Sequence, residues 1–171
     1  MIEVPKNVTQ ALLFDQKMGT TFWAGAIRKE MANVYIAFEK LEGVTEQQML
    51  EGKAKPGFNC GTRMVFDIKM DGKFTRKARL VADGHTTDTP TCITYSSVVS
   101  GESVCIALLI ASLNGLDISA CDIGNAYLNS DSCEKLWTIA DPEFGSDNGS
   151  VMLIVRTLYG LNLVAPHEEQ I

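Results

Sequence analysis

The sequence lacks the features typical of secreted, membrane-spanning and metal-binding proteins. Residues 1–6 contain no charged-then-apolar secretion signal. The longest mainly apolar run, residues 104–113, is too short to span a bilayer. The two histidines, His85 and His167, lie far apart and have no metal-ligand spacing. These absences predict a soluble cytoplasmic or nuclear protein that is neither secreted nor membrane-bound.

The cysteines also lack a binding pattern. There are five, an odd number, and no Cys-x-x-Cys occurs among them. In a chain without a secretion signal, free buried thiols are favoured over disulfides or zinc ligands. This prediction applies to Cys60, Cys92, Cys105, Cys121 and Cys133.

The net charge of −6 argues against a general affinity for nucleic acid. The charge is uneven, however. Residues 53–79 contain eight basic and two acidic residues, so this window carries +6 and the rest of the chain −12. A basic segment on an acidic body can bind phosphates. Lysines can equally serve to keep an exposed edge strand soluble, and charge alone favours that second interpretation.

The periodicity of apolar residues predicts a helix followed by a hairpin. A helix runs from a cap at Thr20 or Thr21 to Val34, with a buried stripe at spacings of four and three: Trp23, Ile27, Met31 and Val34. Residues 42–60 read as a connection. A strand over 62–70 then alternates Met64, Phe66, Ile68 and Met70 with more polar neighbours. Asp71-Gly72 predicts the hairpin turn, and the return strand buries Phe74, Ala78, Leu80 and Ala82.

The second half of the chain predicts a buried helix and further strands. The helix spans residues 102–114, stops at Gly115 and is apolar on nearly all sides, which predicts deep burial. A strand over 117–122 and a short helix over 124–135 follow. Residues 136–139 and 152–156 read as strands, separated by a polar loop at 141–150. A chain of 171 residues suits one domain or part of a larger one, and this order of elements predicts an α+β fold with an antiparallel sheet.

The most informative segment is Asp-Ile-Gly-Asn-Ala-Tyr-Leu-Asn at residues 122–129. Asp122 ends an apolar run, and Tyr127 follows five residues later. A polymerase needs a carboxylate to hold a metal ion at the reacting phosphate. An aromatic ring nearby can discriminate between the sugars of incoming nucleotides by its bulk. Asp122 could instead cap the next helix, and Tyr127 could be an ordinary buried aromatic residue.

Taken in order, the segments resemble the reverse transcriptase domain of copia-type LTR retrotransposons over nearly the whole chain. The resemblance implies a right-hand polymerase fold with fingers at its N-terminal side and part of the palm. It divides the chain into a lead-in at 1–20, a reverse transcriptase-like region at 21–161 and a divergent tail at 162–171. The motifs that carry it are residues 4–8, 22–23, 26–31, 64–72, 76–82, 95–99, 122–129 and 158–161.

The resemblance also implies the chemistry of the site. Asp122 would be the first catalytic aspartate and a ligand of two Mg2+ ions, with the main-chain carbonyl of Ile123 as a further ligand. Two metal ions would activate the primer hydroxyl and stabilise the leaving oxygen. Tyr127 would be the steric gate against a ribose 2′-hydroxyl.

Basic residues of the hairpin would bind the substrates. Arg79, with Lys77 or Lys69 nearby, would face the triphosphate of the incoming deoxynucleotide, because a guanidinium binds phosphate oxygens in a bidentate way. Template and primer would contact Arg76, Gly160 and Leu161. The implied partners are an RNA or DNA template-primer, a deoxynucleoside triphosphate and the remainder of a polyprotein.

The sequence departs from this family in its second catalytic motif. A reverse transcriptase palm carries a Tyr-x-Asp-Asp turn, and no Asp-Asp pair occurs here. Cys105 stands where an Arg is common, and no thumb, protease, integrase or RNase H segment is recognisable. We therefore expect no polymerase activity from this chain alone, and marginal stability or aggregation. A non-catalytic nucleic-acid-binding fragment and an inert transposon relic are the alternative interpretations.

Overall fold

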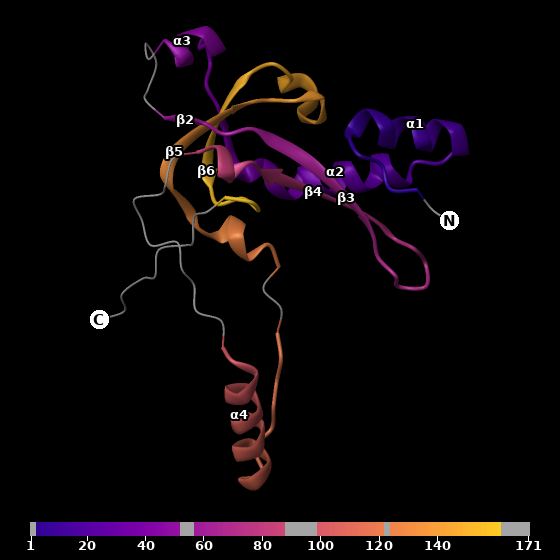
Figure 1. Ribbon diagram of the computed structural model, residues 1–171, viewed down its shortest axis with the longest axis vertical. Helices are drawn as coiled ribbons and strands as arrows, with labels where there is room; N and C mark the ends of the chain where they lie inside the picture. Colours follow the sequence, from indigo (N-terminus) through magenta and orange to yellow (C-terminus); the bar gives the residue numbers. More distant parts are fainter. Residues whose placement is uncertain (1–2, 52–56, 88–98, 122–123, 162–171) are drawn as a thin grey trace.

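A computed structural model describes residues 3–51, 57–87, 99–121 and 124–161 (Figure 1). It has an α+β fold, as predicted. A four-stranded sheet has the order β1-β6-β5-β2, and β3 and β4 form a separate hairpin. The strands are β1 (Phe38–Lys40), β2 (Phe58–Asn59), β3 (Thr62–Ile68), β4 (Arg76–Ala82), β5 (Asp131–Ile139) and β6 (Val151–Arg156).

The sheet is antiparallel except at one edge. Strand β6 pairs antiparallel with both β1 and β5, whereas β2 runs parallel to β5. The prediction of an antiparallel sheet is therefore right for three strands and wrong for β2. This strand falls in residues 42–60, which the sequence presents as a plain connection. The indole N–H of Trp137 donates to the carbonyl of Gly57 at 3.1 Å and helps to hold β2 in place.

Four helices and four short 3-10 turns accompany these strands in the described residues. The helices are α1 (Val8–Met18), α2 (Phe22–Val34), α3 (Glu46–Leu50) and α4 (Gly101–Leu113), and the 3-10 turns are η1 (Tyr35–Ala37), η2 (Gly84–Thr86), η3 (Ala126–Asn129) and η4 (Pro142–Asp147). No helix in the described ranges combines the length and apolar character that crossing a membrane requires.

Helix α2 is confirmed, and so is its buried stripe. Trp23, Ile27, Met31 and Val34 are all buried. They join the core between α2, the hairpin and the larger sheet. The Trp23 ring meets Phe66 edge to face, with ring centroids 5.5 Å apart, an arrangement that adds to the energy of simple burial.

The β3–β4 hairpin is also confirmed, with one correction at its tip. Alternate residues of both strands are buried, as predicted, among them Met64 and Leu80. The Asp71 carboxylate accepts hydrogen bonds from the N–H groups of Lys73 and Thr75. Met70 and Phe74, predicted on the buried face, are 84% and 43% exposed. They lie in the loop, because the strands end at Ile68 and begin again at Arg76.

Helix α1 lies in the segment that the sequence presents as a lead-in. Asn7 caps it by accepting from the N–H of Gln10 at 2.8 Å. Asp15 on this helix is buried and accepts hydrogen bonds from the N–H groups of Trp23 and Ala24 at 3.2 and 2.8 Å. The cap of α2 is therefore Asp15, and the Thr21 side chain, one of the two predicted caps, makes no capping bond.

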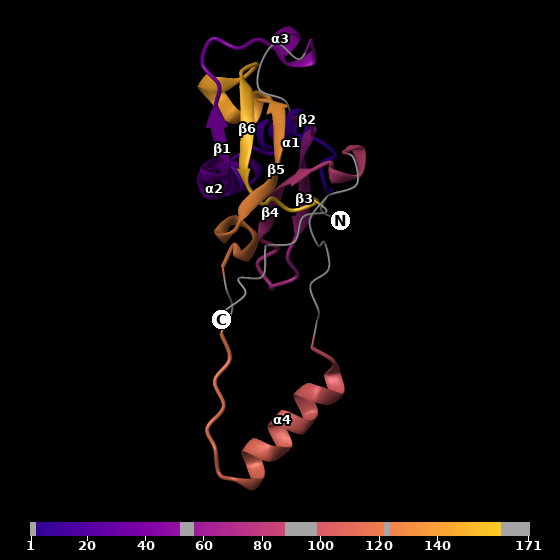
Figure 2. The same cartoon turned by 90° about the vertical axis from the view of Figure 1, so that its left-hand side faces the viewer.

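The position of α4 is confirmed, but its predicted burial is wrong. None of its residues is buried. Figures 1 and 2 show α4 standing clear of both sheets, with residues 116–121 running back from its far end. Its apolar residues point to all sides, so no single face directs it onto the body. Cys105 and Cys121 in this region are exposed rather than buried.

Two predictions around residues 116–135 are also wrong. Residues 117–121, predicted as a strand, are extended but pair with no described strand. The helix predicted over 124–135 is reduced to η3, and β5 begins at Asp131. The cause is pairing with β6: Asp131 is in register with Arg156, and the Thr157 N–H donates to the Ser130 carbonyl at 2.9 Å.

Candidate functional site

The hairpin has two faces of different chemistry. One packs on α2, and the other carries the basic side chains Lys69, Lys77 and Arg79. Lys77 lies across from Asp67, and Arg79 across from Val65. Burial, and then the charges of Arg79 and Lys69, hold the pKa of Lys77 below its usual value, while Glu30 and Asp67 act in the opposite direction. The charges of Arg79 and Lys69 therefore act on Lys77, and an anion placed beside Lys77 would relieve that repulsion.

Two tyrosines extend this basic face. The Arg79 guanidinium carbon lies 5.9 Å from the centroid of the Tyr159 ring. The Tyr159 ring in turn lies 4.9 Å from the Tyr127 ring, at an interplanar angle of 59°. Tyr127 is 51% exposed, so the alternative that it is an ordinary buried aromatic residue is wrong. A cation and two aromatic rings thus form a continuous row.

Backbone contacts fix Tyr159 against the hairpin. Its carbonyl accepts from the N–H of Ala82 at 2.7 Å, and it forms a parallel bridge with Val81. Gly160 follows with φ +89°, and a Cβ there would collide with the Ala82 carbonyl oxygen. Leu161 packs against the core. Gly160 and Leu161 therefore seat Tyr159 beside Arg79.

Arg156 supports the other tyrosine. Its guanidinium donates to the carbonyl of Leu128 at 3.1 Å, and Leu128 is the buried residue of η3. This contact ties η3, and with it Tyr127, to the end of β6. Neither Arg156 nor Tyr159 was predicted as a site residue. The sequence signal for Tyr159 is its position: it is an aromatic residue that directly precedes Gly160.

Arg76 lies on the opposite face of the hairpin. Its guanidinium carbon is 5.2 Å from the Phe22 ring centroid and 5.9 Å from that of Trp23. It also donates to the Phe74 carbonyl at 2.6 Å. The structure therefore brings Lys69, Lys77, Arg79 and Tyr127 to one side of the molecule and places Arg76 against α2.

The predicted metal ligands, Asp122 and Ile123, lie outside the described residues. Within residues 3–51, 57–87, 99–121 and 124–161, no three His, Cys, Asp or Glu side chains gather as a metal site would require. Magnesium binds through carboxylate and other oxygen ligands. The described residues by themselves do not fit a magnesium site.

The basic face can hold phosphate oxygens, and the neighbouring rings can stack on a base. This combination of cations and aromatic residues is typical of surfaces that bind single-stranded nucleic acid. No protein-family model, curated protein or solved structure matches the chain. The reverse transcriptase resemblance therefore remains a prediction.

Proposed function

We propose that the chain forms the fingers and part of the palm of a copia-type RNA-directed DNA polymerase. In this chain the proposed activity is binding of a template-primer or a deoxynucleoside triphosphate, without nucleotidyl transfer. The observation that carries the proposal is the row formed by Arg79, Tyr159 and Tyr127 beside Lys77 and Lys69.

The aromatic residues favour binding over simple solubility. Lysines that only protect an edge strand need no ordered rings beside them. Here two tyrosines from distant segments meet at the basic face, and Gly160 adopts a backbone conformation that side chains rarely allow. Arg79 offers a planar fork for phosphate oxygens, while a ring can stack on any base regardless of sequence.

The proposed lack of catalysis rests on the carboxylates. Transfer by two metal ions requires more than one acidic ligand. The resemblance assigns Asp122 and the Ile123 carbonyl to that role, and the sequence contains no Asp-Asp pair to complete it. Purified chain with magnesium, primer-template and nucleotides is expected to give no extended primer. Extension that disappears in Asp122→Asn would instead assign catalysis to this chain.

The binding test uses a fluorescently labelled RNA–DNA primer-template titrated at several salt concentrations. Lys77→Ala/Arg79→Ala should weaken binding by at least ~10-fold and reduce the salt slope by about 2, because two phosphate contacts are lost. Lys17→Ala/Lys29→Ala removes the same charge away from this face and is the matched control. Tyr159→Ala should weaken binding while leaving the salt slope unchanged.

Two outcomes would reject the binding proposal. Equal losses in the hairpin double variant and its control would show that only net charge matters. Absence of both binding and cooperative unfolding in the wild type would favour the inert-relic alternative. Asp122→Asn is expected to leave binding unchanged, since the proposed contact uses the hairpin face.

A further inference from the structure

Apolar side chains cover the exposed helix α4, and one row of them follows a single side of the helix. Ile106, Leu109, Ile110 and Leu113 follow the spacing i, i+3, i+4, i+7 and are 58%, 59%, 52% and 76% exposed. Glu102 lies one turn earlier on the same side of the helix. With 13 residues, α4 is about 20 Å long. Contiguous exposed apolar side chains of this kind are typical of interaction surfaces.

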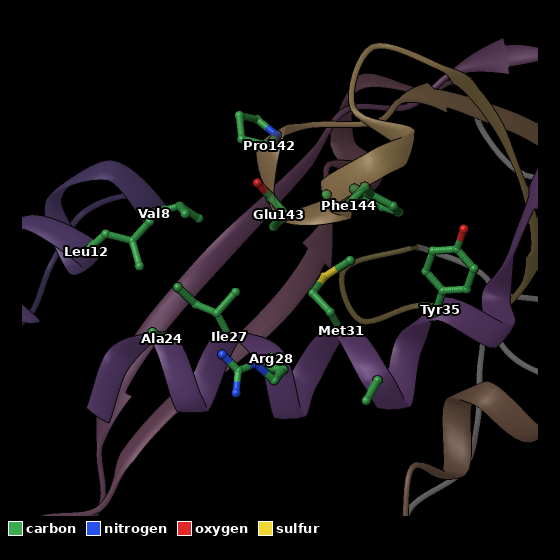
Figure 3. A pocket seen from close by; sticks show the side chains of 12 residues that line it. Val8, Leu12, Ala24, Ile27, Arg28, Met31, Tyr35, Pro142, Glu143 and Phe144 are labelled. Carbon is green, nitrogen blue, oxygen red and sulfur yellow. The ribbon is translucent and has the colours of Figure 1, made fainter. Parts of the chain in front are cut away.

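An apolar groove of about 540 Å³ lies between α1, α2 and η4 (Figure 3). Its floor is α2, one wall is α1 with Val8 and Leu12, and the other wall is η4 with Pro142 and Phe144. The lining follows most of α2 and reaches η1: α2 contributes Ala24, Ile27, Arg28, Met31 and Ala32, and η1 contributes Tyr35. At 1.5 Å per residue, the lining from Ala24 to Tyr35 extends over about 17 Å, close to the length of α4.

We propose that α4 of a second copy of this chain docks in the groove. The α4 helix of the same chain lies away from the groove in both views, so the occupant comes from another molecule (Figures 1 and 2). Each chain carries both this helix and this groove. In a two-fold dimer each groove receives α4 of the other chain, so the two reciprocal contacts cover both helices and both grooves.

The chemistry of the two surfaces is complementary. An apolar helix in an apolar groove is a common mode of recognition, and Ala24 and Ala32 leave room on the floor. The charged side chains of the lining are Arg28 on α2 and Glu143 on the η4 wall. Arg28 is exposed and forms no ion pair with another described residue. A helix seated along α2 can therefore place Glu102 beside Arg28.

The first test is the mass of the full chain by sedimentation equilibrium across a range of concentrations. The wild type is expected to pass from monomer to dimer, and a monomer at all concentrations overturns the proposal. Ile106→Asp/Leu109→Asp should weaken dimerisation at least ~100-fold by removing apolar contact. Met70→Asp/Leu50→Asp places two carboxylates at other exposed apolar residues, is the matched control and should have no effect.

The decisive test mixes two defective chains. Ala32→Trp fills the groove and should prevent dimerisation, whereas Asn33→Trp, at the next and equally exposed position outside the lining, should not. A mixture of Ala32→Trp with Ile106→Asp/Leu109→Asp retains one intact helix and one intact groove, and should form a 1:1 dimer. A mixture that stays monomeric, or an Ala32→Trp chain that still dimerises, overturns the proposal.

Charge exchange tests the pairing independently. Arg28→Glu and Glu102→Arg should each weaken the dimer by roughly 10-fold, since each dimer contains the pair twice. The double variant should recover most of this loss, and Lys29→Glu is the charge-matched control.

If a groove variant fails to fold, a photocrosslinking side chain at Leu113 tests the contact in otherwise native protein. Crosslinks to residues 24–35 of another chain support the proposal, and crosslinks only elsewhere contradict it. The hairpin face takes no part in these contacts, so the result is independent of the proposed function.

Discussion

Helices α2 and α4 have the same length, 13 residues, and opposite environments. Four residues of α2 are buried, and none of α4 is, although α4 is the more apolar helix. In α2 the exposed Arg28 and Lys29 lie off the stripe, so the helix has one direction in which to pack. In α4 apolar residues cover every side, so no direction within the described body is preferred. The arrangement of apolar residues, rather than their number, decides which helix joins the core.

The largest predicted effect contrasts one leucine from each region. Leu80 is fully buried, and Leu80→Ala should lower the free energy of unfolding by about 3 kcal/mol, through lost contacts and a cavity. Leu109→Ala should change it by less than ~0.5 kcal/mol in monomeric protein, because Leu109 is 59% exposed. Urea unfolding followed by tryptophan fluorescence measures both. Equal decreases in the free energy of unfolding for the two variants would show that α4 is packed as tightly as the core.

The next effect concerns the backbone at the hairpin. Gly160→Ala should cost about 2–3 kcal/mol, since the new Cβ collides with Ala82 and the φ of +89° is unfavourable for alanine. Gly43→Ala is the matched control: its φ is +70°, but nothing lies within 4 Å of the added Cβ. It should cost only about 1 kcal/mol. A smaller loss in Gly160→Ala than in Gly43→Ala would contradict the close approach of Tyr159 to β4.

Helix caps give a third comparison of the two regions. Asp15→Ala removes a buried carboxylate that accepts from two N–H groups of α2, and should cost about 2 kcal/mol of global stability. Ser100→Ala removes the cap of α4, which accepts from the Ser103 N–H at 3.2 Å. Ser100→Ala should reduce the helix content measured by circular dichroism and change the midpoint of urea unfolding little. A midpoint shift as large as that of Asp15→Ala would show that α4 unfolds together with the body.

The smallest effect is pH-dependent. Burial raises the pKa of Glu30, and its hydrogen bond from the Leu80 N–H and the charges of Lys77 and Arg79 only partly oppose this. A raised carboxyl pKa contributes stability below the unfolded value of 4.5, and this is lost as the pH rises through the folded pKa. Glu30→Gln keeps an acceptor for Leu80 and should stabilise by at most ~0.5 kcal/mol at pH 7, because water screens the half-exposed group.

The same substitution should have no effect near pH 4, where the native carboxyl is protonated. Free energies of unfolding at the two pH values test the sign. A Glu30→Gln variant that is less stable than the wild type at pH 7, and equal to it at pH 4, would show that the ion pairs outweigh burial.

The sequence predicted best where periodicity and turn chemistry agree. The α2 stripe and the alternation in β3 and β4 follow directly from side-chain spacing. Helix α1 was missed, although Asn7 with Gln10 and the left-handed Gly19 mark its two ends. The length of β5 could not be predicted, since its start depends on the pairing of Asp131 with Arg156, which is distant in sequence, across a register shift before Leu136.

The candidate site was predictable in composition but not in arrangement. The basic residues of the hairpin and Tyr127 stand out in the sequence. That Arg76 faces α2 while Lys77 and Arg79 face away follows from strand alternation. The contact of Tyr127 with Tyr159 joins residues far apart in the chain, and only the folded backbone brings them together. The predicted burial of α4 is wrong because apolar content alone does not supply a packing partner.

The rate at which Cys60 is alkylated can measure how often the core opens around it. Its side chain is fully buried, and burial, with a smaller effect of Asp83, raises the pKa of the thiol to about 11. The reactive thiolate is therefore scarce at neutral pH, and reagents reach the sulfur only when the structure opens. Cys105 and Cys121 are exposed and should be alkylated at once. The slow labelling of Cys60 would report how often the hairpin end of the core separates from β5.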